Sequence, residues 1–210
     1  MDYLSNMSNF NTIIFDLGGV LIDWNPDYVY KTIFDKEEDM RWFYQNICTS
    51  DWNEEQDAGR SLAEATELLV SKFPDHEKNI RVYYDRWTEM LGGPIFGTVE
   101  ILESLKLKGN YKLYALTNWS AETFPVALQR YEFLHWFDGR LVSGEEKMRK
   151  PFKEIYHRLI DKFSIDPTRS IYIDDNTRNL APAASLGLQT IHFRTPHQFR
   201  QELLNLGIII

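Results

Sequence analysis

Residues 12–21 read TIIFDLGGVL, in which a short apolar run is followed by one acidic residue and, after a leucine, by two glycines. The run Thr12–Phe15 is too short for a helix and rich in β-branched residues, which predicts a strand buried on both faces. Four similar runs lie further along the chain, at Lys112–Leu116, Arg140–Val142, Ser170–Ile173 and Thr190–Phe193. Strands of this kind are typical of parallel sheets, because helices cover both faces of such a sheet.

From residue 94 onward the strand-like runs alternate with helical patterns. Helices are expected at Thr98–Leu107, Ala121–Tyr131, Phe152–Phe163, Arg178–Leu186 and Gln198–Leu206. This alternation predicts an α/β fold, a Rossmann-like parallel sheet with helices on both faces.

Residues 24–93 interrupt the α/β pattern and carry helix signals only. Asn25 followed by Pro26 is typical of a helix start, and the sequence Gly-Gly-Pro at residues 92–94 ends the last helix. The simplest interpretation is a catalytic core of residues 1–23 and 94–210, interrupted by an all-helical cap at residues 24–93.

Composition excludes several classes of protein. The 210 residues carry 23 Lys+Arg against 31 Asp+Glu, a net charge of −8, which argues against a nucleic-acid or anionic-membrane partner. Cys48 is the only cysteine, so it forms neither an intrachain disulfide nor a cysteine-based zinc site. The N-terminal residues lack the pattern of a signal peptide, and no apolar run is long enough to span a membrane. We therefore expect a cytoplasmic protein, a monomer or a homodimer.

Polar residues follow each of the first four predicted strands. They are Asp16 with Gly18 and Gly19, then Thr117 and Asn118, then Lys150 before Pro151, and finally Asp174, Asp175, Asn176 and Asn179. Taken alone, Asp or Thr at a strand end is explained as a helix N-cap and Lys before Pro as a solvated helix start, but parallel strands bring their carboxyl ends to one edge, where open α/β sheets bind ligands. The dinucleotide and P-loop glycine motifs are both absent.

In these motifs the sequence resembles the haloacid dehalogenase superfamily, most of whose members are phosphatases. The resemblance covers nearly the whole chain and rests on four motifs in order: Phe15–Leu21, Leu116–Asn118, Lys150–Pro151 and Asp174–Asn179. Residues 24–93 correspond to the family's helical C1-type cap. The resemblance implies a strand order of 5-4-1-2-3, with strands numbered along the chain, which places Asp16 beside the Asp174–Asp175 pair at the topological switch point.

The resemblance also implies roles for the polar residues. Asp16 would be the nucleophile that attacks phosphorus and forms an aspartyl-phosphate. Because a carboxylate and a phosphate repel each other, Lys150 and a divalent cation, expected to be Mg²⁺, would offset their charge. The metal ligands would be Asp16, Asp175, Asp174 and the backbone oxygen of Gly18. Phosphate would be bound by the Thr117 hydroxyl and the backbone N–H groups of Leu17, Gly18 and Asn118, while Asn179 would hold Asp175 or Lys150 in place.

One position departs from the family pattern. Most phosphatases of the family carry a second Asp two residues after the nucleophile, as general acid and base, and here that position is Gly18. Three interpretations stay open. The leaving group needs little protonation, as with a sugar anomeric phosphate; or Glu55, Asp57 or Asp23 replaces the missing acid; or the reaction is not phosphatase chemistry.

A phosphatase of small phosphorylated metabolites, with sugar phosphates favoured, is the first hypothesis. The main alternative is a metal-independent 2-haloacid dehalogenase-type hydrolase, and others are a non-catalytic binding module and a phosphotransferase. Two adjacent carboxylates would repel each other without a cation, which favours the metal-dependent reaction. The cap residues expected to face the substrate are Trp24, Trp52, Glu55, Gly59 and Arg60, of which Arg60 would bind a second anionic group.

Overall fold

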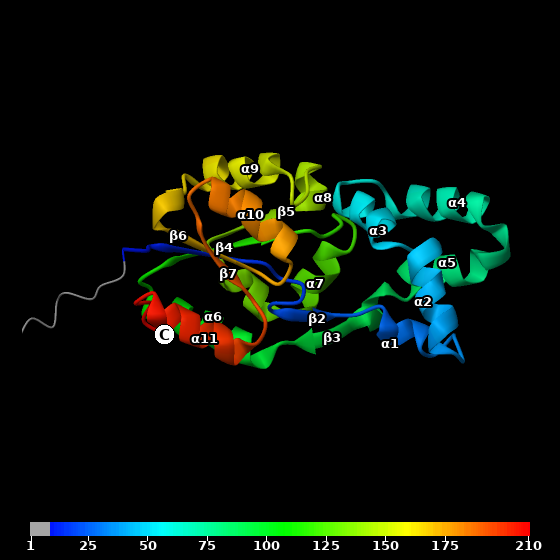
Figure 1. The fold of residues 1–210 in the computed structure, drawn as a ribbon, viewed down its shortest axis with the longest axis horizontal. Helices are drawn as coiled ribbons and strands as arrows, with labels where there is room; N and C mark the ends of the chain where they lie inside the picture. Colours follow the sequence, from blue (N-terminus) through cyan, green and yellow to red (C-terminus); the bar gives the residue numbers. More distant parts are fainter. Residues whose placement is uncertain (1–8) are drawn as a thin grey trace, which may run out of the picture.

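The computed structural model describes residues 9–210 and contains a five-stranded parallel sheet (Figure 1). The first eight residues, which entered the prediction about a signal peptide, lie outside the described part. The strands are β1 (Thr12–Phe15), β4 (Lys112–Thr117), β5 (Gly139–Val142), β6 (Ser170–Asp174) and β7 (Gln189–His192). Their order across the sheet is β5-β4-β1-β6-β7, which confirms the expected order and puts β1 at the centre between β4 and β6.

Helices cover both faces of this sheet, as predicted. They are α6 (Phe96–Lys108), α7 (Phe124–Arg130), α9 (Lys153–Phe163), α10 (Thr177–Ser185) and α11 (Pro196–Asn205). Successive side chains of a strand point to opposite faces, so Ile13 and Phe15 pack with α6, α7 and α11, whereas Ile14 packs with α9 and α10. Figure 1 shows the two helical layers on either side of the sheet.

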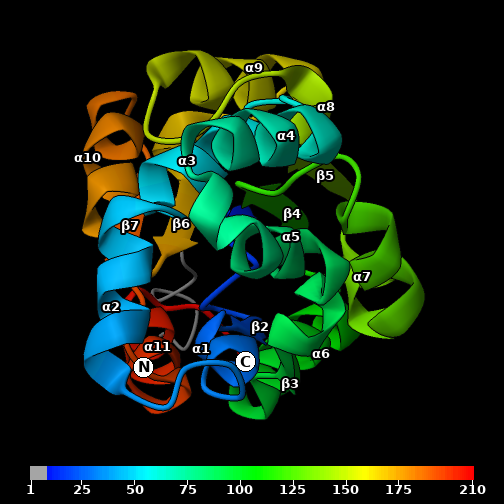
Figure 2. The same cartoon turned by 90° about the vertical axis from the view of Figure 1, so that its right-hand side faces the viewer.

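The helical segment is joined to the sheet by a short antiparallel ribbon that the sequence did not predict. Its strands are β2 (Ile22–Trp24) and β3 (Leu91–Pro94). Between them lie α1 (Asp27–Tyr30), α2 (Glu37–Asn46), α3 (Ser50–Asp57), α4 (Leu62–Lys72), η1 (Pro74–His76), α5 (Glu77–Asp85) and η2 (Trp87–Met90). Figures 1 and 2 show these helices gathered at one end of the molecule, with the ribbon as their link to the sheet.

Helix α3 matters most for the site, because it ends at Asp57. Thr49 caps its start, accepting a hydrogen bond of 3.1 Å from the backbone N–H of Trp52. At its end, Gly59 has a φ of +100° and turns the chain toward α4. The remaining short elements are η3 (Glu132–Trp136), α8 (Ser143–Glu146) and η4 (Pro167–Arg169). Across residues 9–210, no helix combines the length and the apolar character that a membrane crossing requires.

Candidate active site at the edge of the sheet

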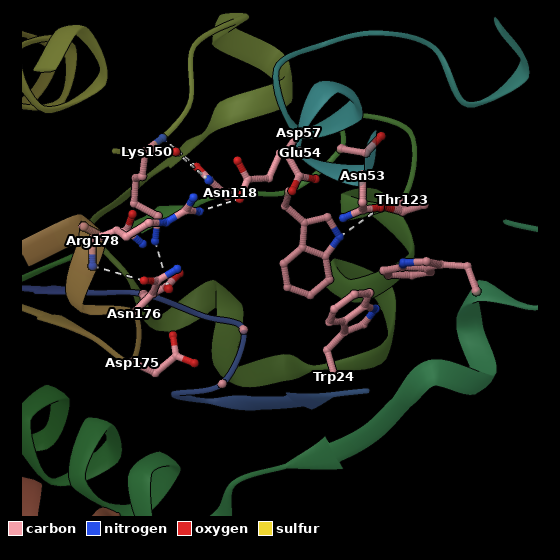
Figure 3. A pocket seen from close by; sticks show the side chains of 17 residues that line it. Trp24, Asn53, Glu54, Asp57, Asn118, Thr123, Lys150, Asp175, Asn176 and Arg178 are labelled. Atoms are coloured by element: carbon pink, nitrogen blue, oxygen red, sulfur yellow. Dashed lines mark hydrogen bonds and ion pairs between the residues drawn. The ribbon is translucent and has the colours of Figure 1, made fainter. Parts of the chain in front are cut away.

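A cavity of about 420 Å³ lies between the carboxyl ends of the strands and the helical segment. From the core side it is lined by Asp16, Gly18, Gly19, Asn118, Trp119, Ser120, Thr123, Lys150, Asp175, Asn176, Arg178 and Asn179. From the opposite side it is lined by Trp24, Asn53, Glu54, Asp57 and Trp87. Figure 3 shows Lys150, Asn176 and Asp175 on one side of this cavity and Trp24 and Asn53 on the other. The strand-end residues therefore meet at one place, as parallel strands require.

Lys150 is a buried cation between two carboxylates. Its Nζ lies 2.8 Å from Oδ2 of Asp16 and 2.7 Å from Oδ2 of Asp174. The Lys150 side chain is 1% exposed and that of Asp174 is fully buried, while Asp16 keeps a small exposed area. A lysine is tolerated at such depth only when it is paired, so its position is fixed by the two carboxylates.

Asp174 is held by several donors besides Lys150. The amide Nδ2 of Asn179 lies 3.0 Å from each carboxylate oxygen of Asp174, and the backbone N–H of Asn176 donates to Oδ1 at 2.8 Å. The hydroxyl of Tyr172 also donates to Oδ2. Asn179 was expected to hold Asp175 or Lys150, and its amide contacts Asp174 instead, because Asp174 is the carboxylate that points into the interior. Its effect on Lys150 is therefore indirect.

Burial and charge set the pKa values of this group. Burial, with a contribution from Asp174, raises the pKa of Asp16 well above its usual value, against the lowering effect of Lys150. For Asp174, burial favours the neutral form, but Lys150 and the hydrogen bonds of Lys150 and Tyr172 outweigh it and lower the pKa. Burial also disfavours the charged form of Lys150, yet the two carboxylates prevail and raise its pKa. Asp174 and Lys150 thus form the ion pair at pH 7.

Three carboxylates meet closely enough to share a cation. One oxygen from each of Asp16, Asp174 and Asp175 lies within 4.8 Å of the others. Oxygen donors of this kind fit Mg²⁺, and the exposed Asp175 is the least engaged of the three, because Asp174 already accepts bonds on both oxygens. Gly19 allows this approach: its φ is +72°, and a Cβ there would lie 2.3 Å from Oδ2 of Asp175.

The remaining predicted residues of the core take varied positions. Asn118 lines the cavity and clamps the backbone of Lys150, accepting from its N–H at 2.8 Å and donating to its carbonyl at 3.0 Å. The backbone N–H of Leu17 donates to Oδ1 of Asp16 at 2.7 Å, which fixes the orientation of that carboxylate. Thr117 is buried at the end of β4, and neither it nor Leu17 contributes to the cavity lining.

Arg60 does not line the cavity. Its guanidinium bonds Oε1 of Gln56 at 2.8 Å and the carbonyl of Trp52 at 3.0 Å, so it holds the turn after α3 together. Trp52 packs among the tyrosines of the helical segment. Glu55 and Gly59 also lie outside the cavity, and of the five residues expected to face the substrate only Trp24 does so.

Several residues that line the cavity were not predicted from the sequence, among them two tryptophans and one ion pair. Trp119 follows β4, and Trp87 was interpreted as part of the helical core from its spacing; the two rings pack edge to face, with centroids 5.8 Å apart. Glu54 and Arg178 join the helical segment to the core: Glu54 pairs with Arg178 and, at 2.6 Å, with Arg149. A long-range pair of this kind leaves no local pattern in the sequence.

A Rossmann-like sheet with buried carboxylates and a paired lysine at its switch point is the arrangement of an enzyme site. The family model of haloacid dehalogenase-like hydrolases matches residues 10–187. The chain belongs to this family and is a hydrolase.

Proteins similar to this chain include several phosphatases. The sesquiterpene phosphatase astK of Aspergillus oryzae is 26% identical over 185 residues, which cover 88% of this chain and 90% of that protein. The phosphorylated carbohydrates phosphatase of Thermotoga maritima is 27% identical over 190 residues, which cover 86% of this chain and 83% of that protein.

A similar fold is found in a solved structure of a haloacid dehalogenase family enzyme from Bacteroides thetaiotaomicron, a magnesium complex. Its TM-score is 0.69 at 24% identity, covering 91% of this chain and 99% of that one.

Proposed function

We propose that this hydrolase is a Mg²⁺-dependent phosphatase of small phosphorylated metabolites that works through an aspartyl-phosphate on Asp16. The observation that carries the proposal is the cluster of Asp16, Asp174 and Asp175 around one buried lysine. Three carboxylates and one ammonium leave a net negative centre when ionised, which favours a bound divalent cation. The similar phosphatases from Aspergillus and Thermotoga support the same reaction class.

In this proposal each residue acts through the geometry described above. Asp16 attacks phosphorus, with its carboxylate oriented by the backbone N–H of Leu17 and by Lys150. Lys150 donates to a phosphoryl oxygen, and the N–H groups of Gly18 and Asn118 complete the phosphate site. The Thr117 hydroxyl, which is buried behind the cavity lining, would have to turn toward the phosphate to join them. Asp175, Asp16 and the Gly18 carbonyl would hold Mg²⁺, with Asp174 beside them, and the bound ion would offset repulsion between Asp16 and the phosphate. Asp174 and Asn179 position Lys150.

Residues 24–93 would act as a cap that excludes water and selects the substrate. Sugar phosphates are the class that the sequence favours, because an anomeric leaving group suits a site without an acid at Gly18. Phosphates of apolar alcohols are a second class, which the indole rings of Trp24, Trp87 and Trp119 at the cavity support. The cytoplasmic location and the choice between monomer and homodimer stay predictions from the sequence.

The test is a broad panel of phosphate esters assayed for released phosphate with Mg²⁺ and with EDTA. We expect Mg²⁺-dependent hydrolysis, and loss of it in Asp16→Asn but not in Asp161→Asn, a matched change on the outer surface of α9. Halide release from 2-haloacids in EDTA, with no phosphate released from the panel, would favour the dehalogenase alternative. Inactivity on both panels would favour the non-catalytic alternative.

A further inference from the structure

We propose that Asp57, at the end of α3, is the general acid and base of this site and supplies from the helical segment the carboxyl group that Gly18 lacks. The inference rests on the proposed phosphatase function and deepens it. The sequence left three carboxylates open for this role, and the structure separates them by position.

Position selects Asp57 among the three candidates. Asp57 lines the same cavity as Asp16, Lys150 and Asp175. Glu55 lies outside it, half exposed, with its carboxylate 3.3 Å from Arg149. Asp23 also lies outside it and accepts a hydrogen bond from Tyr28.

Glu54 is the other acidic residue that reaches the cavity from the helical side, and it is already occupied. Its two oxygens pair with Arg149 and Arg178. Asp57 forms no ion pair within residues 9–210, although the nearby backbone of Ser120 favours its charged form and so acts to lower its pKa. A carboxyl group with few partners in a substrate-sized cavity is free to exchange a proton with a bound molecule.

The surroundings of Asp57 suit proton transfer near neutral pH. Burial raises its pKa from 3.8 to about 7, and the neighbouring charge of Glu54 acts in the same direction, while Lys150, Arg149 and Ser120 act against it. The carboxyl group also lies at the C-terminal end of α3, where the helix dipole disfavours negative charge. Both protonation states are therefore accessible at pH 7, as an acid that later acts as a base requires.

Asp57 gives up one proton in the first step of the proposed reaction and regains one in the second. As an Asp16 oxygen forms a bond to phosphorus, the bond from phosphorus to the leaving oxygen breaks, and the proton of Asp57 moves to that oxygen. The alcohol departs and leaves a carboxylate on Asp57. This carboxylate then takes a proton from a water molecule, whose oxygen attacks phosphorus and breaks the bond to Asp16. Phosphate leaves, and Asp57 is protonated again.

Asp57→Asn tests both halves of this role with two substrates. With an alkyl phosphate, whose leaving group needs a proton, we expect kcat/KM to fall by about 10²–10⁴. With p-nitrophenyl phosphate the first step needs no acid, so the variant should release one p-nitrophenolate per enzyme in a burst and then turn over slowly. Asp51→Asn, an exposed change on the same helix, should behave as the wild type.

The second variant restores an acid at position 18. A Cβ at residue 18 would meet no heavy atom within 4 Å, so a side chain at this position starts in open space. We expect Gly18→Asp to recover part of the alkyl phosphatase activity of Asp57→Asn, which a purely structural defect would not allow.

Several outcomes would overturn the inference. Equal losses on both substrates without a burst would make Asp57 structural, and unchanged rates would make it irrelevant. A substrate-dependent loss in Glu55→Gln instead would move the role to that residue. In each of these cases the wild type still hydrolyses phosphate esters, so the proposed function stands. A wild type that hydrolyses none of them would overturn both.

Discussion

Replacing Lys150 by methionine removes the cation from the buried centre and keeps much of the side-chain volume. Asp16 and Asp174 then lose partners at 2.8 and 2.7 Å, in surroundings that admit almost no water. Removing one partner of a buried ion pair typically costs about 3–5 kcal/mol. Although Lys150 has two carboxylate partners, we expect the free energy of unfolding to fall by an amount within this range and not by twice as much. Asp174 keeps its hydrogen bonds from Tyr172 and Asn179, and Asp16 can take up a proton.

The pH dependence of this loss identifies its cause. In the wild type Lys150 lowers the folded pKa of Asp174, so the resulting stability is present above the unfolded pKa of about 3.8 and disappears as the pH falls below it. In Lys150→Met the carboxylates of Asp16 and Asp174 have no cationic partner, and their protonation removes the cost of burying an unpaired negative charge. The difference in free energy of unfolding between wild type and variant should therefore be largest near pH 7 and shrink toward pH 4.

The measurement is urea unfolding followed by circular dichroism in EDTA, at several pH values. Lys153→Met, an exposed change at the start of α9, is the matched control and should stay within 0.5 kcal/mol of wild type, as surface changes usually do. Adding Asp174→Asn to Lys150→Met should recover about 1 kcal/mol or more, because it removes one stranded charge. A loss below about 1 kcal/mol at pH 7, or one independent of pH, would refute the ion-pair reasoning.

Four further predictions follow from particular contacts. Gly19→Ala should weaken Mg²⁺ binding in calorimetry by tenfold or more, because its Cβ would displace Asp175, whereas Gly109→Ala, with a similar φ of +67° and no neighbour within 4 Å, should not. Tyr172→Phe should lower the free energy of unfolding by about 1–3 kcal/mol in urea titrations, since Asp174 loses a buried donor. Glu54→Gln should speed amide hydrogen exchange in α3, because both of its arginine pairs weaken. Asp57→Asn should raise the free energy of unfolding by up to about 4 kcal/mol at pH 8 and hardly change it at pH 4. The reason is that folding raises the pKa of Asp57 from 3.8 to about 7, so the ionised carboxylate destabilises the folded protein increasingly as the pH rises between these values. Thermal unfolding at the two pH values measures this difference.

Most residues that the sequence proposed for the core side of the site line one cavity, because several of them follow a buried strand closely. A strand fixes where its last residue lies, and parallel strands end at one edge, so Asp16 and Asp175, which follow β1 and β6 directly, could be placed together without knowing any helix orientation. Lys150 lies further from its strand, beyond β5 and the short helix α8, and its place rested on the family resemblance. The bond from Asn179 to Asp174 was not predicted, because it depends on which way each carboxylate turns.

The helical side of the site was predicted poorly for physical reasons. Helical spacing reports that a side chain is buried but not what covers it, so Trp87 was assigned to the helical core although it also lines the cavity. Strand β2 has only three residues and strand β3 contains two glycines, so neither shows the alternation of apolar and polar residues by which a strand is predicted. Arg60 was correctly placed beside a helix break, but its guanidinium turns back onto α3, where the buried Gln56 and the carbonyl of Trp52 accept its protons.

An acid carried by the helical segment would make catalysis depend on how that segment sits over the core. Asp57 shares α3 with Glu54, and Glu54 pairs with Arg149, next to Lys150, and with Arg178 in the first turn of α10, which follows Asp175. The contacts that hold the two parts together are thus one helical turn from the proposed proton donor. An acid at position 18 would stay beside Asp16 whatever the cap did, and would protonate leaving groups in an open, wet site. With Gly18 in its place, the proposed nucleophile and proton donor would meet only when the cavity is assembled, so that water exclusion, substrate selection and proton transfer would occur together.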